Sequence, residues 1–156
     1  MVVDVELAER YWYPDDGGQV WLAGYQLVDP ETGSFLGRDA PLLAERGLHV
    51  TGLAGARHRA GALASDALAP GRPLELRRDP ANEFDANAIA VYAAGEQAGF
   101  VPRELAAELA DELDAGRPWS AVVLREQRDS PRDPRTGVTM LLAPATTIEL
   151  RVKAQT

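Results

Sequence analysis

Short segments of alternating apolar and polar residues, separated by glycine and proline, dominate this sequence. In residues 73–78, Leu74 and Leu76 alternate with charged neighbours, and residues 88–93 repeat the pattern. A period of two is typical of half-buried strands. The same pattern predicts further strands at residues 19–28, 96–101, 119–125, 138–142 and 147–153. A chain with many short strands is expected to form a small barrel or a curled, mostly antiparallel sheet.

One stretch has a helical period instead. Between Pro102 and Gly116, three leucines recur every four residues and so share one face of a helix. The leucines are Leu105, Leu109 and Leu113. Proline suits the first helical position and glycine the end, so the spacing predicts a main helix over residues 102–115. Alanine-rich residues 60–67 predict a second, short helix that would pack on the sheet with it.

The composition narrows the chemistry that the chain can perform. The absence of cysteine excludes disulfides, thiolate zinc sites, iron–sulfur clusters and a cysteine nucleophile. No glycine-rich phosphate loop occurs, and we expect no metal and no small-molecule cofactor. A formal net charge of −8 disfavours binding of nucleic acid or anionic lipid over the whole surface. The sequence has no secretory signal and no apolar run of about 18 residues, which predicts a cytoplasmic protein without membrane contact.

Polar side chains concentrate between two predicted strands, in residues 77–91. Asp79, Asn82 and Asp85 are residue types that hydrogen-bond to neighbouring backbone, and they therefore favour a loop. Phe84 is the exception. A large aromatic side chain in a polar loop either plugs the core beneath it or forms a stacking platform at the mouth of a site. The sequence leaves both interpretations open, and Asp85 also fits a simple turn.

This loop is part of a longer motif. Its residues are Arg78-Asp-Pro-x-Asn-x-Phe-Asp-x-Asn-Ala-Ile-x-Val91, Gly95, Gly99-Phe-Val-Pro-Arg103 and Leu105-Ala106, preceded by Gly55-Ala-Arg-His-Arg59. Over roughly residues 48–152 the chain resembles the HIRAN domain family. HIRAN domains occur in certain DNA-remodelling helicases and as stand-alone bacterial proteins, and this chain is similar to the stand-alone type.

The resemblance implies a mainly β (α+β) fold, a small OB-like or SH3-like antiparallel β-barrel with one main helix and one short helix. Residues 49–156 would form this barrel. Residues 1–48 lack a core pattern of their own and would be an N-terminal extension packed on it. The implied function is non-catalytic recognition of single-stranded DNA 3′ ends in DNA repair or replication-associated processes, with a protein partner such as a helicase or nuclease.

The resemblance also assigns DNA-binding roles to individual residues. They are Arg57, His58, Asn82, Phe84, Asp85 and Arg103. The arginine–histidine pair falls where the family grips a terminal nucleotide, and Phe84 falls at a tyrosine position in the motif. Asp85 falls at the carboxylate that accepts a hydrogen bond from the terminal hydroxyl, and it would repel a phosphate there. Arg103 falls at a basic residue near phosphate. Each arginine equally fits a solvated surface.

Two other classes of function remain open. A metal-dependent nuclease would gather His58, Asp79, Glu83 and Asp85 around a divalent cation, although no metal-site spacing supports it. A protein-interaction adaptor fits an acidic domain with an added N-terminal segment.

Two further expectations concern less distinctive features. Polar residues 125–135, which contain two prolines, predict a mobile hairpin loop. Trp12, Trp21 and Trp119 are expected mostly to fill the core, because the chain has few aromatic side chains.

Overall fold

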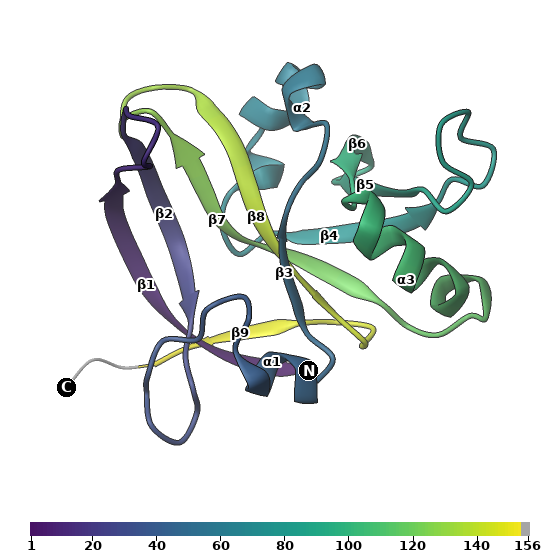
Figure 1. The fold of residues 1–156 in the computed structure, drawn as a ribbon, viewed down its shortest axis with the longest axis horizontal. Coiled ribbons are helices and arrows are strands. Elements are labelled where there is room, and N and C mark those ends of the chain that lie inside the picture. Colours follow the sequence, from purple (N-terminus) through teal and green to yellow (C-terminus); the bar gives the residue numbers. More distant parts are fainter. Residues whose placement is uncertain (154–156) are drawn as a thin grey trace.

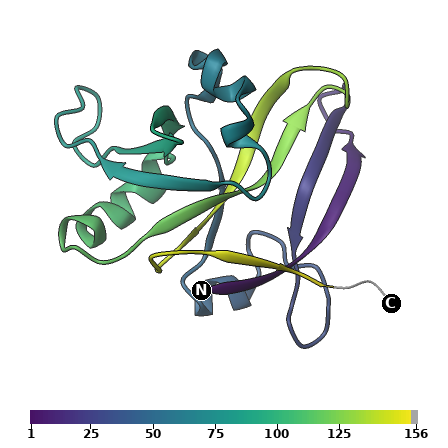
Figure 2. The same ribbon diagram turned by 180° about the vertical axis from the view of Figure 1, so that it is seen from behind.

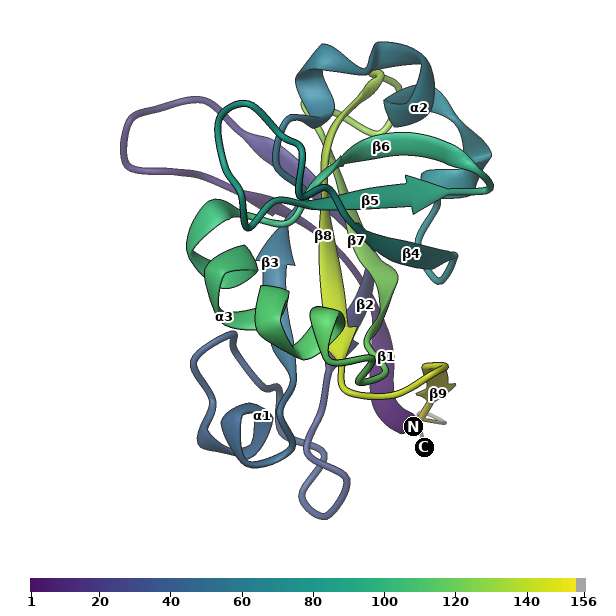
Figure 3. The same ribbon diagram turned by 90° about the vertical axis from the view of Figure 1, so that its right-hand side faces the viewer.

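The computed structural model describes residues 1–153. Its strands are β1 (Val2–Trp12), β2 (Val20–Leu27), β3 (His49–Gly52), β4 (Pro73–Arg78), β5 (Ile89–Ala93), β6 (Glu96–Phe100), β7 (Ser120–Arg128), β8 (Arg135–Ala143) and β9 (Glu149–Val152). Its helices are α1 (Pro41–Glu45), α2 (Ala60–Ala64) and α3 (Arg103–Asp114), with 3-10 turns η1 (Ala56–His58) and η2 (Asp66–Leu68). Figures 1, 2 and 3 show these elements from three sides.

The strands form one bent sheet whose order is β6-β5-β4-β7-β2-β1-β9, with β8 paired to β7 and β3 paired to β8. The expected mainly β fold is confirmed, but the sheet does not close into the expected barrel. Among the described strands, the pairings are antiparallel except for β1 with β9, which is parallel. The path instead ends at β6 on one side and at β9 on the other. The prediction of a closed, OB-like barrel is therefore not confirmed, because the sheet stays open.

Both predicted helices are present in the structure at the predicted positions, and residues 1–153 contain one further helix. The main helix, α3, and the short helix, α2, lie inside the predicted ranges. In Figure 3, α3 lies beside β3, at one side of the crossing strands. The additional helix α1 has five residues and begins at Pro41. A single turn of this kind has no helical repeat that a sequence pattern can reveal.

The loop expected over residues 125–135 is shorter in the structure, because the strands extend into both of its ends. Strand β7 continues to Arg128 and β8 begins at Arg135, so the connecting segment is only residues 129–134. Glu126 accepts hydrogen bonds from both arginines, at 2.8 and 2.9 Å. Burial raises the pKa of Glu126, but these hydrogen bonds outweigh it and the pKa is lowered. The polar residues thus stabilise each other within the ladder, where their composition alone favours a loop.

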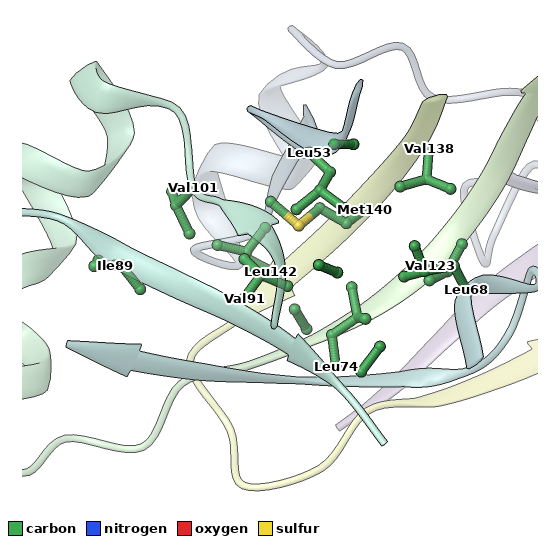
Figure 4. Packing of buried hydrophobic residues seen from close by; sticks show 14 of the residues in the cluster. Leu53, Leu68, Leu74, Ile89, Val91, Val101, Val123, Val138, Met140 and Leu142 are labelled. Atoms are coloured by element: carbon green, nitrogen blue, oxygen red, sulfur yellow. The ribbon is translucent and has the colours of Figure 1, made fainter. Parts of the chain in front are cut away.

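Two hydrophobic clusters form the core, and β7 and β8 contribute to both. Val123, Met140 and Leu142 belong to the cluster beneath α2, α3 and the β4–β6 strands, which Figure 4 shows. Leu124 and Leu141 belong to the other cluster. Neighbouring residues of one strand point to opposite faces, so one pair of strands supports two layers.

The second cluster joins the first 48 residues to the rest of the chain. Val3 and Val5 of β1 pack with residues of β7 and β8, and β2 pairs with β7. Asp4, which is buried, accepts a hydrogen bond from Arg151 at 2.6 Å, and Lys153 lies 3.3 Å away. The hydrogen bond from Arg151 is the main reason that the pKa of Asp4 is lowered, against the effect of burial. A charged contact therefore holds β1 and β9 together.

Among residues 1–153, no helix is both long and apolar enough to cross a membrane.

Candidate nucleic-acid interface

The polar residues of the 79–88 loop first hold the loop itself in shape. Asn82 Oδ1 accepts hydrogen bonds from the backbone N–H groups of Phe84, at 2.9 Å, and Asp85, at 3.2 Å. Its Nδ2 donates to Asp79 at 3.1 Å, and Asp85 Oδ1 accepts from the Asn87 N–H at 2.9 Å. Such short-range contacts are the local turns that these residue types favour. The loop therefore presents Phe84 from a defined backbone.

Arg78 closes the base of this loop. Its guanidinium donates to the carbonyl oxygens of Ala88, at 2.7 Å, and Ala86, at 2.9 Å. A further hydrogen bond, at 2.9 Å, joins it to Asp114 at the end of α3. This role of Arg78 was not predicted from the sequence, although Arg78 opens the motif on which the resemblance rests. Its side chain is mostly buried, so it positions the loop and is not itself a contact for a ligand.

Phe84 does not plug the core, because 83% of it is exposed. Figure 1 shows its loop projecting from the ends of β4 and β5. Beneath it lies a pocket of about 270 Å³, which we call the loop pocket. The loop pocket is lined by Ala54, Asn82, Phe84, Asp85, Ala88, Phe100, Val101 and Arg103. Of the two interpretations of Phe84, the geometry favours the stacking platform.

The loop pocket contains one pair of opposite charges. Asp85 Oδ2 lies 4.0 Å from Arg103 Nε, and the Asp85 side chain is only 18% exposed. Arg103 begins α3, and most of its side chain is in solvent. Because Oδ1 already accepts from the loop backbone, Oδ2 is the carboxylate oxygen that a ligand in this pocket could reach.

Arg57 and His58 line a different, adjacent pocket of about 290 Å³, which we call the histidine pocket. Its lining residues are Gly52, Leu53, Gly55, Ala56, Arg57, His58, Gln127, Thr136, Gly137 and Val138. Both predicted residues are exposed. The structure thus brings four of the six predicted residues into one pocket and the other two into its neighbour. Gln127 was missed because it lies in the segment predicted to be a mobile loop, and Thr136 because it lies between that segment and the strand predicted over residues 138–142.

The two pockets meet at a close backbone contact between β6 and the segment after β3. Ala54 and Phe100 exchange backbone hydrogen bonds of 2.9 and 2.8 Å. Gly99 allows this approach, since a Cβ there would lie 2.4 Å from the Ala54 carbonyl oxygen. Gly55 has a left-handed backbone, with φ of 73°, and starts the turn that carries Arg57. Glycines of the motif therefore position both pockets.

The acidic residues proposed for a metal site do not form one. Among residues 1–153, no group of three or more His, Cys, Asp or Glu side chains is arranged to hold a metal ion.

Comparison with known proteins gives one family. The family model of the HIRAN domain matches residues 46–140. The chain belongs to the HIRAN family. HIRAN domains are known DNA-binding modules. A similar solved structure is the crystal structure of the HIRAN domain of human HLTF, with 24% sequence identity, coverage of 62% of this chain and 75% of that chain, and a TM-score of 0.46. A comparison with curated proteins gave no match.

The family match confirms the resemblance found in the sequence. It covers both the loop pocket and the histidine pocket, whose lining residues lie between residues 52 and 138. Residues 1–45 lie outside it.

Proposed function

We propose that this HIRAN domain binds the 3′ end of single-stranded DNA and performs no chemistry on it. The observation that carries the proposal is the exposure of Phe84 above a pocket that also holds a largely buried carboxylate. An exposed aromatic ring stacks on a base of any sequence, which gives sequence-tolerant affinity. A role in repair or replication follows from this proposal, because free 3′ ends arise in both.

The carboxylate of Asp85 supplies selectivity in this proposal. Its Oδ2 atom accepts a hydrogen bond from a terminal 3′-hydroxyl, whereas a terminal phosphate in the same place would be repelled. Arg103, 4.0 Å from that oxygen, is placed to contact the phosphate that precedes the terminal sugar. Arg57 and His58, in the histidine pocket, would contact the next part of the backbone.

Two substitutions, each of which removes one negative charge, test the role of Asp85. In Asp85→Asn, the amide oxygen can still accept from the Asn87 N–H, while the amide nitrogen replaces the acceptor that faces the pocket. Glu83→Gln is the matched control, because Glu83 is an exposed acid of the same loop that does not line the pocket. The measurement is fluorescence anisotropy with single strands that differ only in a 3′-hydroxyl or a 3′-phosphate.

We expect the unmodified protein and the Glu83→Gln variant to prefer the 3′-hydroxyl strand, and Asp85→Asn to lose the preference. Equal affinity for both strands in the unmodified protein would contradict the role of Asp85. Absence of binding at low salt would contradict the whole proposal and leave the adaptor function. Cleavage of labelled DNA in the presence of magnesium or manganese, lost in Asp85→Ala, would instead support the nuclease.

A further inference from the structure

A third pocket gathers three arginines from distant parts of the chain. Arg10 comes from β1, Arg38 from the segment before α1, and Arg125 from β7. This arginine pocket has a volume of about 270 Å³, just below the range of about 300–1,000 Å³ that is usual for small-ligand sites. Its lining residues are Arg10, Trp12, Leu22, Gln26, Leu27, Leu36, Gly37, Arg38, Val50, Arg125, Gln127 and Thr139.

The three guanidinium groups have no anionic partner among residues 1–153. Arg125 is partly buried, and its side chain donates one hydrogen bond, of 2.9 Å, to the carbonyl oxygen of Tyr25. Burial lowers the pKa of Arg125, and the positive charges of Arg10 and Arg38 lower it further. The like charges are therefore close enough to interact, and the fold holds them together without neutralising them.

Each of these arginines has an acidic neighbour in the sequence that does not line the arginine pocket. Glu126 forms ion pairs with Arg128 and Arg135 instead. Glu9 and Asp39 do not line the arginine pocket, although Arg38 also lines the neighbouring pocket that contains Asp39. In a protein with a net charge of −8, such a concentration of positive charge is a specific feature of this site.

Two further observations connect this site to a nucleic acid strand. Gln127 lines both the arginine pocket and the histidine pocket, so the two are adjacent. Trp12, expected from the sequence to fill the core, is 53% exposed and lines the arginine pocket. Strand β2 pairs with β7, with Trp21 opposite Arg128, so the β1–β2 and β7–β8 hairpins are neighbours in the sheet. An exposed indole beside unpaired arginines combines base stacking with phosphate contact.

We infer that the arginine pocket binds backbone phosphate of the same DNA single strand, on the 5′ side of the end held in the loop pocket, with a base stacked on Trp12. The inference rests on the proposed single-strand binding. The pockets then follow one another as loop pocket, histidine pocket and arginine pocket, linked by Ala54 to Ala56 and by Gln127. A strand that spans all three would gain phosphate contacts that a short strand cannot reach.

The test compares 3′-hydroxyl strands of about 4 and about 16 nucleotides, the range of site sizes for small single-strand-binding domains. Anisotropy titrations over a series of salt concentrations use the unmodified protein and the double variant Arg10→Gln/Arg38→Gln. The control is Arg72→Gln/Arg132→Gln, which removes the same charge from exposed arginines that line none of the three pockets. Thymidine monophosphate is titrated in parallel.

We expect the long strand to bind more tightly than the short one. The Arg10→Gln/Arg38→Gln variant should lose about 3- to 10-fold in long-strand affinity, and its slope of log affinity against log salt should fall by about 0.7 to 1.4. The affinity of this variant for the short strand should stay unchanged. The control variant should still bind the long strand more tightly than the short one.

Several results would overturn the inference while leaving end recognition intact. The first is a long strand that binds no more tightly than the short one. The second is a difference in affinity between the two strands that is unchanged in Arg10→Gln/Arg38→Gln. The third is a loss of long-strand affinity that is equally large in the control variant. Binding of thymidine monophosphate more tightly than the short strand would assign the pocket to free nucleotides and also overturn it. Conversely, an arginine-dependent gain without any 3′-hydroxyl preference would uphold the arginine pocket and reject the end-binding role. Binding of neither strand at low salt would reject both.

Discussion

The loop pocket and the arginine pocket differ in charge and in the segments that build them. The loop pocket holds one carboxylate beside one guanidinium, and its residues lie within the family match. The arginine pocket holds three guanidinium groups, and Arg10 and Arg38 come from outside that match. Contacts to phosphate position a nucleic acid without reading it, whereas selective contacts identify its end. Under the proposed function, the loop pocket would therefore supply the selectivity, and the arginine pocket would supply the larger share of the charge-driven affinity.

The two pockets also differ in what holds them. Short-range hydrogen bonds within residues 79–88 shape the loop pocket. The arginine pocket depends on strand pairing over long sequence separations, such as Leu22 with Gln127 and Gly24 with Arg125. A substitution in one pocket should therefore leave the other pocket unchanged, unless it alters the sheet that supports both.

The largest effect is expected from Gly99→Val, at the joint between the loop and histidine pockets. A Cβ at this position would lie 2.4 Å from the Ala54 carbonyl oxygen and 3.0 Å from Leu53. The free energy of unfolding should fall by about 3 kcal/mol. Urea titration measures the fall, and Gly61→Ala is the control, because no atom lies within 4 Å of its added Cβ. A Gly99→Val protein as stable as the control would show that the backbone contact between Ala54 and Phe100 can move apart at little cost.

Phe84→Ala should weaken single-strand binding by about 1–3 kcal/mol, the usual contribution of one stacked base. Because Phe84 is exposed and uncharged, the free energy of unfolding and the salt slope should both stay unchanged. Anisotropy at several salt concentrations separates these quantities. A changed salt slope would mean that loss of the Phe84 ring also disturbs the phosphate contacts, against a purely stacking role for this side chain.

Asp4→Asn should lower the free energy of unfolding by about 1 kcal/mol at neutral pH, because it removes the charged contact that joins β1 to β9. The pKa of Asp4 is held below its ordinary value of 3.8 in the folded protein. Its ionised form therefore stabilises the fold above that value, and this contribution is lost as the pH falls through the lowered pKa.

The difference in unfolding free energy between Asp4→Asn and the unmodified protein should thus shrink in acid. Urea titrations at about pH 6 and about pH 3 measure it, with the exposed Asp15→Asn as control. Because Arg10 also lies on β1, Asp4→Asn should disturb the arginine pocket and leave the loop pocket unaffected. A difference that is independent of pH would argue against the ion pair as its cause.

The smallest overall effect is expected from Arg103→Gln. Its contact with Asp85 spans 4.0 Å and most of the arginine side chain is exposed, so the free energy of unfolding should change by less than about 0.5 kcal/mol. Loss of one phosphate contact should reduce the salt slope for a short strand by about 0.7. An unchanged slope would remove Arg103 from the strand contacts, and Arg57 would then be the cation to substitute next.

The sequence by itself determined the features that depend on neighbouring residues. Alternation located β4 and β5, the leucine repeat located α3, and the motif around Phe84 identified the HIRAN family. The loop between β4 and β5 also followed from its asparagine and aspartate residues, because their hydrogen bonds reach only two or three positions along the chain.

Only the tertiary structure decided how distant segments meet. Exposure of Phe84 and Trp12, the separation of Arg57 from the loop pocket, and the convergence of three arginines all depend on which strands pair and where the sheet stays open. Residues 125–135 illustrate the reason. Their polar composition is typical of a loop, but five of these eleven residues lie in β7 and β8, where Arg135 pairs with Glu126 across the hairpin. No local pattern encodes that cross-strand contact.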